Sequence, residues 1–410
     1  MDVLANTNQE SSAPISRSAL TSLFILVFLD NLGYAIVVPY LYFFVQSLGG
    51  SALLYGVLLA SYSLMSFIFT PLVARLSDRY GRRKILLAAL AVSSFSYFVF
   101  GTAHALWLLF VGRMLSGTTA ATVPVAQAYV ADITTPNQRL RYLGLLGAAA
   151  GIAFILGPAL GGVLSSLFSY GVPSFLASAL ALTNLILAYF RLPEPSSFNI
   201  KRTVVSFTDL LRVLRKRKIA LLLGSYFVFF VAFVFLQSAL SPWLQKVFGY
   251  GSLQTGLVFF FVGGISVMTQ AVFLPALNKK IDQLTLTLLS VTILALGLVA
   301  LAGVGNLALL LIVSSVIAFG FGIQYVTVNT LISVNTPKDA QGGALGIAWA
   351  IAGLAQTIAP VLSTSLFSFG VSNGFSGLVF VVSAAISLLV LPLILAFRRT
   401  SSSLRTAEKV

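Results

Sequence analysis

The sequence predicts an all-α membrane protein with about twelve transmembrane helices in two six-helix halves that repeat each other. Its composition is 58% apolar and 9% charged, with a mean hydropathy of +0.99, which leaves too little polar surface to cover a soluble globule. A helix needs about 20 mostly apolar residues to cross a bilayer, and about twelve such stretches stand between charged or turn-rich breaks. They lie near residues 20–45, 52–74, 85–103, 106–130, 143–168, 174–192, 219–245, 253–277, 284–303, 307–333, 343–368 and 375–397.

The positive charges predict how these helices are oriented. If the first helix runs from inside to outside, 23 of the 25 lysines and arginines fall in inner segments, while Lys246 falls outside and Arg113 within a span. Inner loops of membrane proteins carry the excess of basic residues, so we expect both termini in the cytoplasm and the protein in the plasma (inner) membrane. The net charge of +15 therefore reflects topology, and we expect no binding to nucleic acid.

An internal repeat divides the chain near its middle. Nine residues of the first half recur in the second at offsets of 201 to 204 residues, more than chance would give. We therefore expect an N-terminal six-helix half (1–192), a basic cytoplasmic linker (193–218) and a C-terminal six-helix half with a short cytoplasmic tail (219–410). The repeated residues are Pro71, Asp78, Thr135, Pro136, Leu143, Gly144, Gly151, Ala153 and Pro158.

The composition argues against several kinds of chemistry. The chain has no cysteine and a single histidine, His104, so disulfides, thiolate metal sites and histidine clusters are excluded. We expect His104 on the surface of an outer loop, with proton coupling as the alternative. No nucleotide-binding loop or serine–histidine arrangement supports an enzyme, and we expect no metal or cofactor. The polar N-terminal stretch lacks the order of a cleavable signal, so we expect the first apolar segment to remain as a span.

Four segments carry motifs of known type. ARLSDRYGRRK (74–84) places five cations and one carboxylate between two spans. LDNLGYAIVVP (29–39) lies in the first span, GRMLSG (112–117) in the fourth and GAAAGIAFILGPALGG (147–162) in the fifth. On these motifs the chain resembles the major facilitator superfamily, and within it the 12-helix drug/proton antiporters of the tetracycline and multidrug efflux type. This resemblance implies two halves that rock around a central site.

The match differs from the family pattern in three places. The loop begins with Ala74 where the family usually has glycine, a small-for-small change. The corresponding segment of the second half, NKKID (278–282), has neither the glycine nor the downstream run of cations. Acidic residues that tetracycline exporters commonly use in other helices are absent, which argues against tetracycline itself as the substrate.

Asp30 is the one acidic residue inside a predicted span. A carboxylate near the bilayer centre costs roughly 2.5–3.5 kcal/mol on insertion scales, so it should face a cavity and protonate readily. We expect it to carry the coupling proton or bind the substrate, and the alternative is a permanent hydrogen bond to neighbouring helices.

Arg113 keeps its charge and needs an acceptor, for which Asp30 or polar groups of the first helix are candidates. We expect it to tune the proton affinity of Asp30, with a static pair as the alternative.

The charged loop is expected to act as a gate. Gly81 permits a tight reversal, and the Asp78 carboxylate can accept hydrogen bonds from a helix N-terminus or from Arg79, Arg82 or Arg113. Such contacts would latch the cytoplasmic side in the outward-open state, whereas simple positive-inside topology is the alternative. The expected gating residues are Asp78, Arg79, Gly81, Arg82 and Arg83.

The fifth span is expected to line the moving interface. Its glycines leave one face without side chains and Pro158 bends it, with ordinary small-residue packing as the alternative. The repeated Gly353 and Pro360 suggest a partner helix in the other half. The expected antiporter-helix residues are Gly147, Gly151, Gly157, Pro158, Gly161 and Gly162.

A substrate cavity should combine aromatic faces with isolated polar groups. An aromatic pocket with one carboxylate favours amphipathic cations through stacking and cation–π attraction. For each candidate the alternative is packing between helices or against lipid. The candidates are Asn31, Tyr34, Gln127, Phe230, Phe233, Gln237, Gln324, Tyr325, Asn329, Trp349 and Gln356.

Taken together, these features predict a monomeric, proton-coupled secondary transporter that exports small lipophilic drugs or metabolites, cations among them, by alternating access. Its expected partners are the small-molecule substrate, protons and the lipid bilayer. A symporter or facilitator of a small organic solute on the same fold is one alternative, and a membrane receptor without transport is the alternative from another class.

Overall fold

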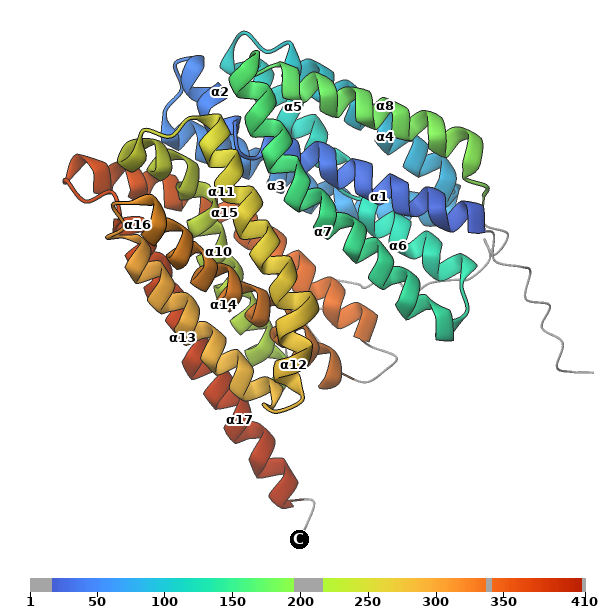
Figure 1. Cartoon of the computed structure of the whole chain (residues 1–410). Helices are drawn as coiled ribbons and strands as arrows, with labels where there is room; N and C mark the ends of the chain where they lie inside the picture. Colours follow the sequence, from blue (N-terminus) through green and yellow to red (C-terminus); the bar gives the residue numbers. More distant parts are fainter. Residues whose placement is uncertain (1–16, 195–216, 337–340, 408–410) are drawn as a thin grey trace, which may run out of the picture.

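The computed structural model describes residues 17–194, 217–336 and 341–407 (Figure 1). Within this part of the chain, 12 helices are long and apolar enough to cross a membrane, which confirms the predicted fold class. Nearly all of the expected linker lies outside the described residues. The helices of the first half are α1 (Arg17–Val37), α2 (Leu41–Ser47), α3 (Ala52–Tyr80), α4 (Arg82–Gly101), α5 (Leu106–Thr118), α6 (Thr122–Ile133), α7 (Pro136–Leu167) and α8 (Val172–Arg191).

The second half follows the same plan. One of its spans contains a short π-helix, labelled η1, between α11 and α12. Its helices are α10 (Arg217–Phe248), α11 (Ser252–Met268), η1 (Thr269–Phe273), α12 (Leu274–Asn278), α13 (Gln283–Leu301), α14 (Leu307–Val334), α15 (Gln341–Ser372), α16 (Leu378–Leu388) and α17 (Val390–Ala407).

Prolines account for several of the breaks. Pro39 follows the end of α1 after one residue, and Pro275 lies in the first turn of α12, directly after the π-helix. Proline cannot donate a backbone hydrogen bond and restricts the residue before it, so a helix ends or widens there. In contrast, Pro158 lies inside α7 and Pro360 lies inside α15, and neither proline ends its helix. Each of these helices is 32 residues long.

The predicted charged loop is shorter than expected. The helix α3 continues to Tyr80 and α4 begins at Arg82, so Gly81 alone separates them. Gly81 has φ 107°, a conformation that residues with a side chain rarely adopt. The segment 74–84 is thus two helix ends joined by a one-residue reversal.

Each half has its own apolar core. Trp243 and Phe380 pack edge to face in the second half with ring centroids 5.1 Å apart. In the first half, polar groups also tie the helices together: the Asn184 side chain of α8 donates to the Leu26 carbonyl of α1 at 3.0 Å, and the hydroxyls of Tyr40 and Ser174 lie 2.6 Å apart. Each half is thus packed internally.

Between the halves, α7 packs on α11 and α3 packs on α15. The helices α7 and α15 therefore both lie at the interface, but each has a different partner. Figure 1 shows α11 running beside α7 at the end of the bundle near α2, which we call the α2 end. At this end a Cβ added to Gly256 would lie 3.0 Å from the Gly162 Cα, and one added to Gly56 would lie 2.7 Å from the Pro360 carbonyl oxygen. Glycine is needed because backbones of the two halves nearly touch.

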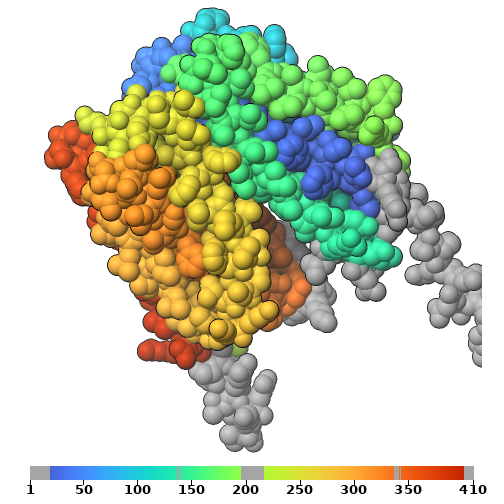
Figure 2. Space-filling view, in the orientation of Figure 1, coloured from blue at the N-terminus to red at the C-terminus, as the bar shows by residue number. Residues whose placement is uncertain are grey.

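The opposite end, which we call the Gly81 end, is open between the halves. A Cβ added to Gly144 or Gly147 of α7, or to Gly346 of α15, would meet nothing within 4 Å. Figure 2 shows a hollow between the beginning of α7 and the lower part of α11. The structure is therefore closed at the α2 end and open at the Gly81 end. A hydrogen bond of 2.6 Å between the side chains of Gln46 and Gln245 bridges the closed end.

We expect Gly256→Leu to weaken closure at the α2 end, because the added side chain would collide with the α7 backbone. Gly264→Leu on the same helix is the matched control, since a Cβ there meets nothing within 4 Å. The chain lacks cysteine, so Gln46→Cys and Gln245→Cys provide a clean pair for a short thiol cross-linker. Cross-linking should fall severalfold with Gly256→Leu and stay unchanged with Gly264→Leu; equal yields in the two variants would contradict the glycine contact.

Candidate functional site

Arg113 lies deep in the first half, on α5. Its side chain is 1% exposed, and its guanidinium carbon lies 4.6 Å from the ring centre of Tyr62 and 5.3 Å from that of Tyr34. The Nε and one terminal nitrogen are buried without a hydrogen-bond partner. Two aromatic faces therefore stabilise this charge by cation–π attraction, and two of its donor groups remain available to a ligand or to water.

Asp30, on α1, does not pair with Arg113. The ion pairs found among the described residues both belong to Arg82. Asp30 is half-buried, and no hydrogen bond of its carboxyl group is found in the described part of the chain. The sequence led us to expect Asp30 or polar groups of the first helix as partners of Arg113, and in this conformation the contact from the first helix is made by the ring of Tyr34.

Tyr62 was missed by the sequence reasoning, although it contacts Arg113. Its ring centre lies 4.6 Å from the Arg113 guanidinium carbon and 5.2 Å from the ring centre of Tyr34. Tyr34 in turn packs edge to face on Phe154 of α7 at 6.0 Å. A tyrosine inside an otherwise apolar span was the available signal, because its hydroxyl usually requires a polar neighbour.

The second half contributes an aromatic cluster from α10 and α14. Phe233 stacks on Phe321 with centroids 4.1 Å apart, and Phe230 lies 6.4 Å from Tyr325. These contacts bring together the predicted Phe230, Phe233 and Tyr325. The cluster also contains three residues that were not predicted: Tyr226, Phe229 and Phe321.

The predicted polar cavity residues have different surroundings. Gln324 is 0% exposed even though the halves are separated at one end, and both polar atoms of its amide are buried without a partner, so it lines no accessible space in this conformation. The Asn31 amide donates to the Val27 carbonyl at 2.8 Å. Asn329 donates to the Tyr325 carbonyl and lies 3.5 Å from the Tyr226 hydroxyl.

The remaining candidates keep accessible surface. Trp349 is 55% exposed and lies one helical turn before Gly353, which faces Phe67 of α3. It therefore lies on the side of α15 that faces the first half. Gln127 is exposed, and Gln237 and Gln356 are half-buried.

Arg82 organises the Gly81 end of the first half. Its guanidinium forms an ion pair with Asp78 one turn earlier and a second with Asp132 of α6 at 3.1 Å. It also donates to the Ser77 hydroxyl at 2.5 Å. Asp132 was not predicted as a site residue, because it lies 50 residues after Arg82 along the chain. One buried arginine thus joins α3, α4 and α6. We call the group formed by Ser77, Asp78, Arg82 and Asp132 the Arg82 corner.

Arg83 connects the Arg82 corner to the end of α8. Its guanidinium donates to the Tyr189 carbonyl at 2.7 Å and lies over the Tyr189 ring. Its backbone N–H donates to a Glu194 carboxylate oxygen at 3.3 Å. Arg79, by comparison, stacks on its neighbour Tyr80 at 5.3 Å. The predicted gating residues therefore belong to one corner, but they play different structural roles.

The repeat does not reproduce this corner in the second half. Asp282, which matches Asp78 by position, caps the N-terminus of α13, accepting from the Thr285 hydroxyl at 2.7 Å and from its backbone N–H at 3.0 Å. These hydrogen bonds hold the pKa of Asp282 below its usual value. Asp282 is thus a local helix cap.

The glycines of α7 do not share one partner. Gly157 and Gly161 approach Ala35 and Ile36 of α1, within the first half, whereas Gly162 faces α11 in the other half. Gly147 has no close neighbour at its Cβ position. The expected single bare face is therefore wrong: some glycines let α7 pack against α1, and Gly162 allows contact between the halves.

Among the described residues, no three histidine, cysteine, aspartate or glutamate side chains come together to hold a metal ion. The chemistry that these residues offer is binding: a half-buried carboxylate, a buried guanidinium and aromatic faces from both halves. Such groups can bind a small molecule and a proton.

Comparison with known proteins shows the family to which the chain belongs. The chain is 30% identical over 399 residues to the tetracycline resistance protein, class C, of Escherichia coli, covering 96% of this chain and 99% of that protein. It is 25% identical to multidrug resistance protein 2 of Bacillus subtilis (strain 168), covering 88% and 92%. Among solved structures, the human organic anion transporter MFSD10 (TETRAN) matches with a TM-score of 0.68 at 21% identity, covering 93% of this chain and 100% of that one. The Major Facilitator Superfamily model matches residues 23–360, and the chain therefore belongs to this superfamily of membrane transporters.

Proposed function

We propose that the protein exports small lipophilic drugs or metabolites in exchange for protons. The observation that carries this proposal is Asp30, a half-buried carboxylate within a membrane span for which the described residues provide no hydrogen bond or ion pair. The resemblance to tetracycline and multidrug resistance proteins supports drug export. The aromatic groups around Tyr34 and Phe233 suit a lipophilic substrate.

The positive charges support an orientation with the Gly81 end in the cytoplasm. Lysines and arginines concentrate in the segments at that end, as the positive-inside rule requires. In this orientation the structure is inward-open, because the halves separate at the Gly81 end and touch at the α2 end. A substrate would enter the space between the halves from the cytoplasmic side.

Coupling would arise at Asp30. A protonated carboxyl group has no charge to offer a cationic substrate, so proton and substrate compete for one group. Arg113, in the same half, contacts the rings of Tyr34 and Tyr62. A rearrangement of these rings during the change of conformation would therefore alter the surroundings of this second charge.

The Arg82 corner would hold three helices of the first half together in every state. It links the ends of these helices within one half, so they would move together when the halves rock. The sequence led us to expect these residues to latch the outward-open state, whereas the partners of Arg82 found here all lie within the first half.

The variant Asp30→Asn should keep its expression level and lose proton-driven uphill transport, because an amide cannot exchange a proton. The matched control is Asp282→Asn, since asparagine also caps a helix and Asp282 lies outside the spans. Efflux against a gradient, measured in vesicles with equal protein levels, should vanish in the first variant and persist in the second. Full uphill efflux by Asp30→Asn would eliminate this residue as the proton carrier.

The direction of coupling can be measured in proteoliposomes of known orientation. One pH unit supplies about 1.4 kcal/mol per proton, which an antiporter should use to drive the substrate against the proton flow. In detergent, adding ethidium as a cationic lipophilic probe should release protons, and lowering the pH should weaken its binding. Movement of probe and proton in the same direction would show a symporter, and flux that ignores the gradient would show a facilitator.

Arg82→Gln should destabilise the protein more than Arg79→Gln does. Arg82 is largely buried and forms ion pairs with two carboxylates, whereas Arg79 contacts the ring of the neighbouring Tyr80. A lost hydrogen bond to a charged group costs about 1.5–3 kcal/mol. Thermal unfolding in detergent should therefore show a clearly lower midpoint for Arg82→Gln alone, and equal midpoints for the two variants would contradict a structural role of this corner.

A further inference from the structure

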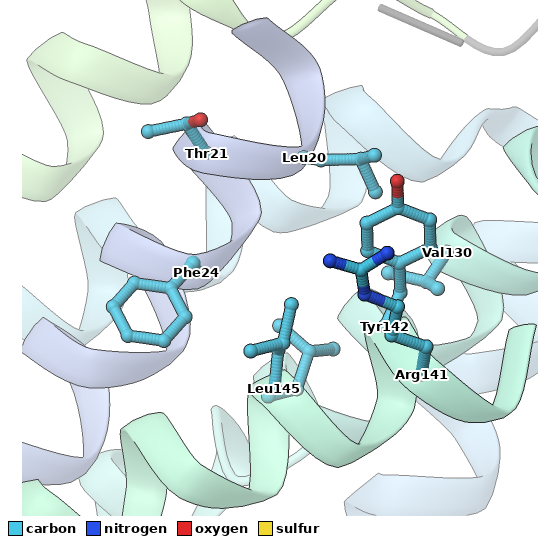
Figure 3. Close-up of a pocket in the computed structure, with 8 residues that line it drawn as sticks. Leu20, Thr21, Phe24, Val130, Arg141, Tyr142 and Leu145 are labelled. Carbon is cyan, nitrogen blue, oxygen red and sulfur yellow. The ribbon is translucent and has the colours of Figure 1, made fainter. Parts of the chain in front are cut away.

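A pocket of about 490 Å³ lies between α1, α6 and α7 (Figure 3). Its volume is within the range of small-molecule sites. It lies near the ends of these helices that face the Gly81 end, away from the aromatic residues around Arg113. The pocket is lined by Leu20, Thr21, Phe24, Val130, Arg141, Tyr142, Leu145 and Leu146.

Arg141 provides the pocket with a positive charge. Figure 3 shows its guanidinium directed into the space between α7 and α1, and no hydrogen bond or ion pair of this side chain is found within the described residues. Arg139, two residues earlier, donates to the Ala131 carbonyl at 2.9 Å. The chain therefore uses one arginine to hold α6 and α7 together and leaves the charge of the other free for a ligand.

The rest of the pocket is mainly apolar. Leu20 and Phe24 form the wall on α1, and Leu145 faces them from α7. The hydroxyl of Tyr142 lies near the charged end of the pocket (Figure 3). A ligand that matches this lining carries a negative group at one end and a hydrocarbon portion at the other.

The pocket lies at the ends of candidate membrane spans, which begin at Ala19 in α1 and at Arg141 in α7. The helix α1 begins at Arg17, so Leu20 and Phe24 are about 5–10 Å along the helix from its end at 1.5 Å per residue. In the orientation proposed above, this level belongs to the cytoplasmic leaflet. Basic pockets between helices at that level bind anionic lipid headgroups.

We propose that this pocket binds an anionic phospholipid of the cytoplasmic leaflet. Arg141 binds a phosphate oxygen through charge-assisted hydrogen bonds, and the upper part of one acyl chain lies along Leu20, Phe24 and Leu145. The assignment to this leaflet rests on the proposed orientation, but the site does not depend on the proposed transport reaction.

The test is lipid binding to the purified full-length protein in a neutral detergent, measured by native mass spectrometry. The probes are palmitoyl-oleoyl phosphatidylglycerol and the phosphatidylcholine with the same chains. We expect the anionic lipid to bind more tightly, and Arg141→Gln to weaken its binding about tenfold, as the loss of a charge-assisted contact predicts. Arg141→Lys should retain part of the affinity.

Two further variants separate this site from general electrostatic attraction. Lys280→Gln removes one exposed charge at the same end of the other half and should leave binding unchanged. Leu145→Trp fills the pocket while keeping all charges and should weaken binding as Arg141→Gln does. The cross-linking yield of Gln46→Cys with Gln245→Cys verifies that each variant is folded.

Three outcomes would overturn the proposal: equal binding of the two lipids, unchanged binding by Arg141→Gln, or the same loss with Lys280→Gln. Displacement of phosphatidylglycerol by millimolar 2-naphthoate would instead assign the pocket to a soluble aromatic anion and would also reject the lipid. These measurements involve no transport. The lipid proposal can therefore be rejected while the exporter proposal holds, and the exporter proposal can be rejected while the lipid proposal holds.

Discussion

The inability of hydrocarbon to solvate charge is the constraint on which this structure depends. Among the described residues, it confines almost all of the lysines, arginines, aspartates and glutamates to the ends of the helices and the segments between them, and it makes the two exceptions, Asp30 and Arg113, informative. Arg113 is accommodated by the rings of Tyr34 and Tyr62, without a carboxylate. Asp30 is left without an ion pair among the described residues, so its charge can be removed by a proton instead.

A transporter of this kind has to hold its halves together at one end while the other end opens. The structure meets this requirement by giving each half its own apolar core and joining the halves through glycine contacts at Gly56, Gly162 and Gly256. Contacts of this type bring backbones close without interlocking large side chains, so they can be broken without repacking either core. The hydrogen bond between Gln46 and Gln245 adds a polar contact at the rim of the closed end.

The internal repeat has diverged where the two halves meet the open end. In the first half, Arg82 joins α3, α4 and α6 through Asp78, Ser77 and Asp132. In the second half, Asp282 caps α13 and remains a local feature. The first half also has a pocket at this end, which is lined by Arg141 and residues of α1, α6 and α7. The halves thus share a backbone plan but differ in the charges they present to the cytoplasmic side in the proposed orientation.

The twelve spans and the isolated charges were predictable from the sequence, because apolar length and charge placement are local properties that the bilayer itself selects. The contact partners of individual side chains were not predictable from the sequence. Tyr62 beside Arg113, Asp132 beside Arg82 and Gly162 beside Gly256 are brought together by helices distant in the chain, and Gln324 is fully buried although its neighbour Tyr325 keeps some accessible surface. Helical periodicity indicates which residues share a face, but only the packing of the helices decides what that face contacts.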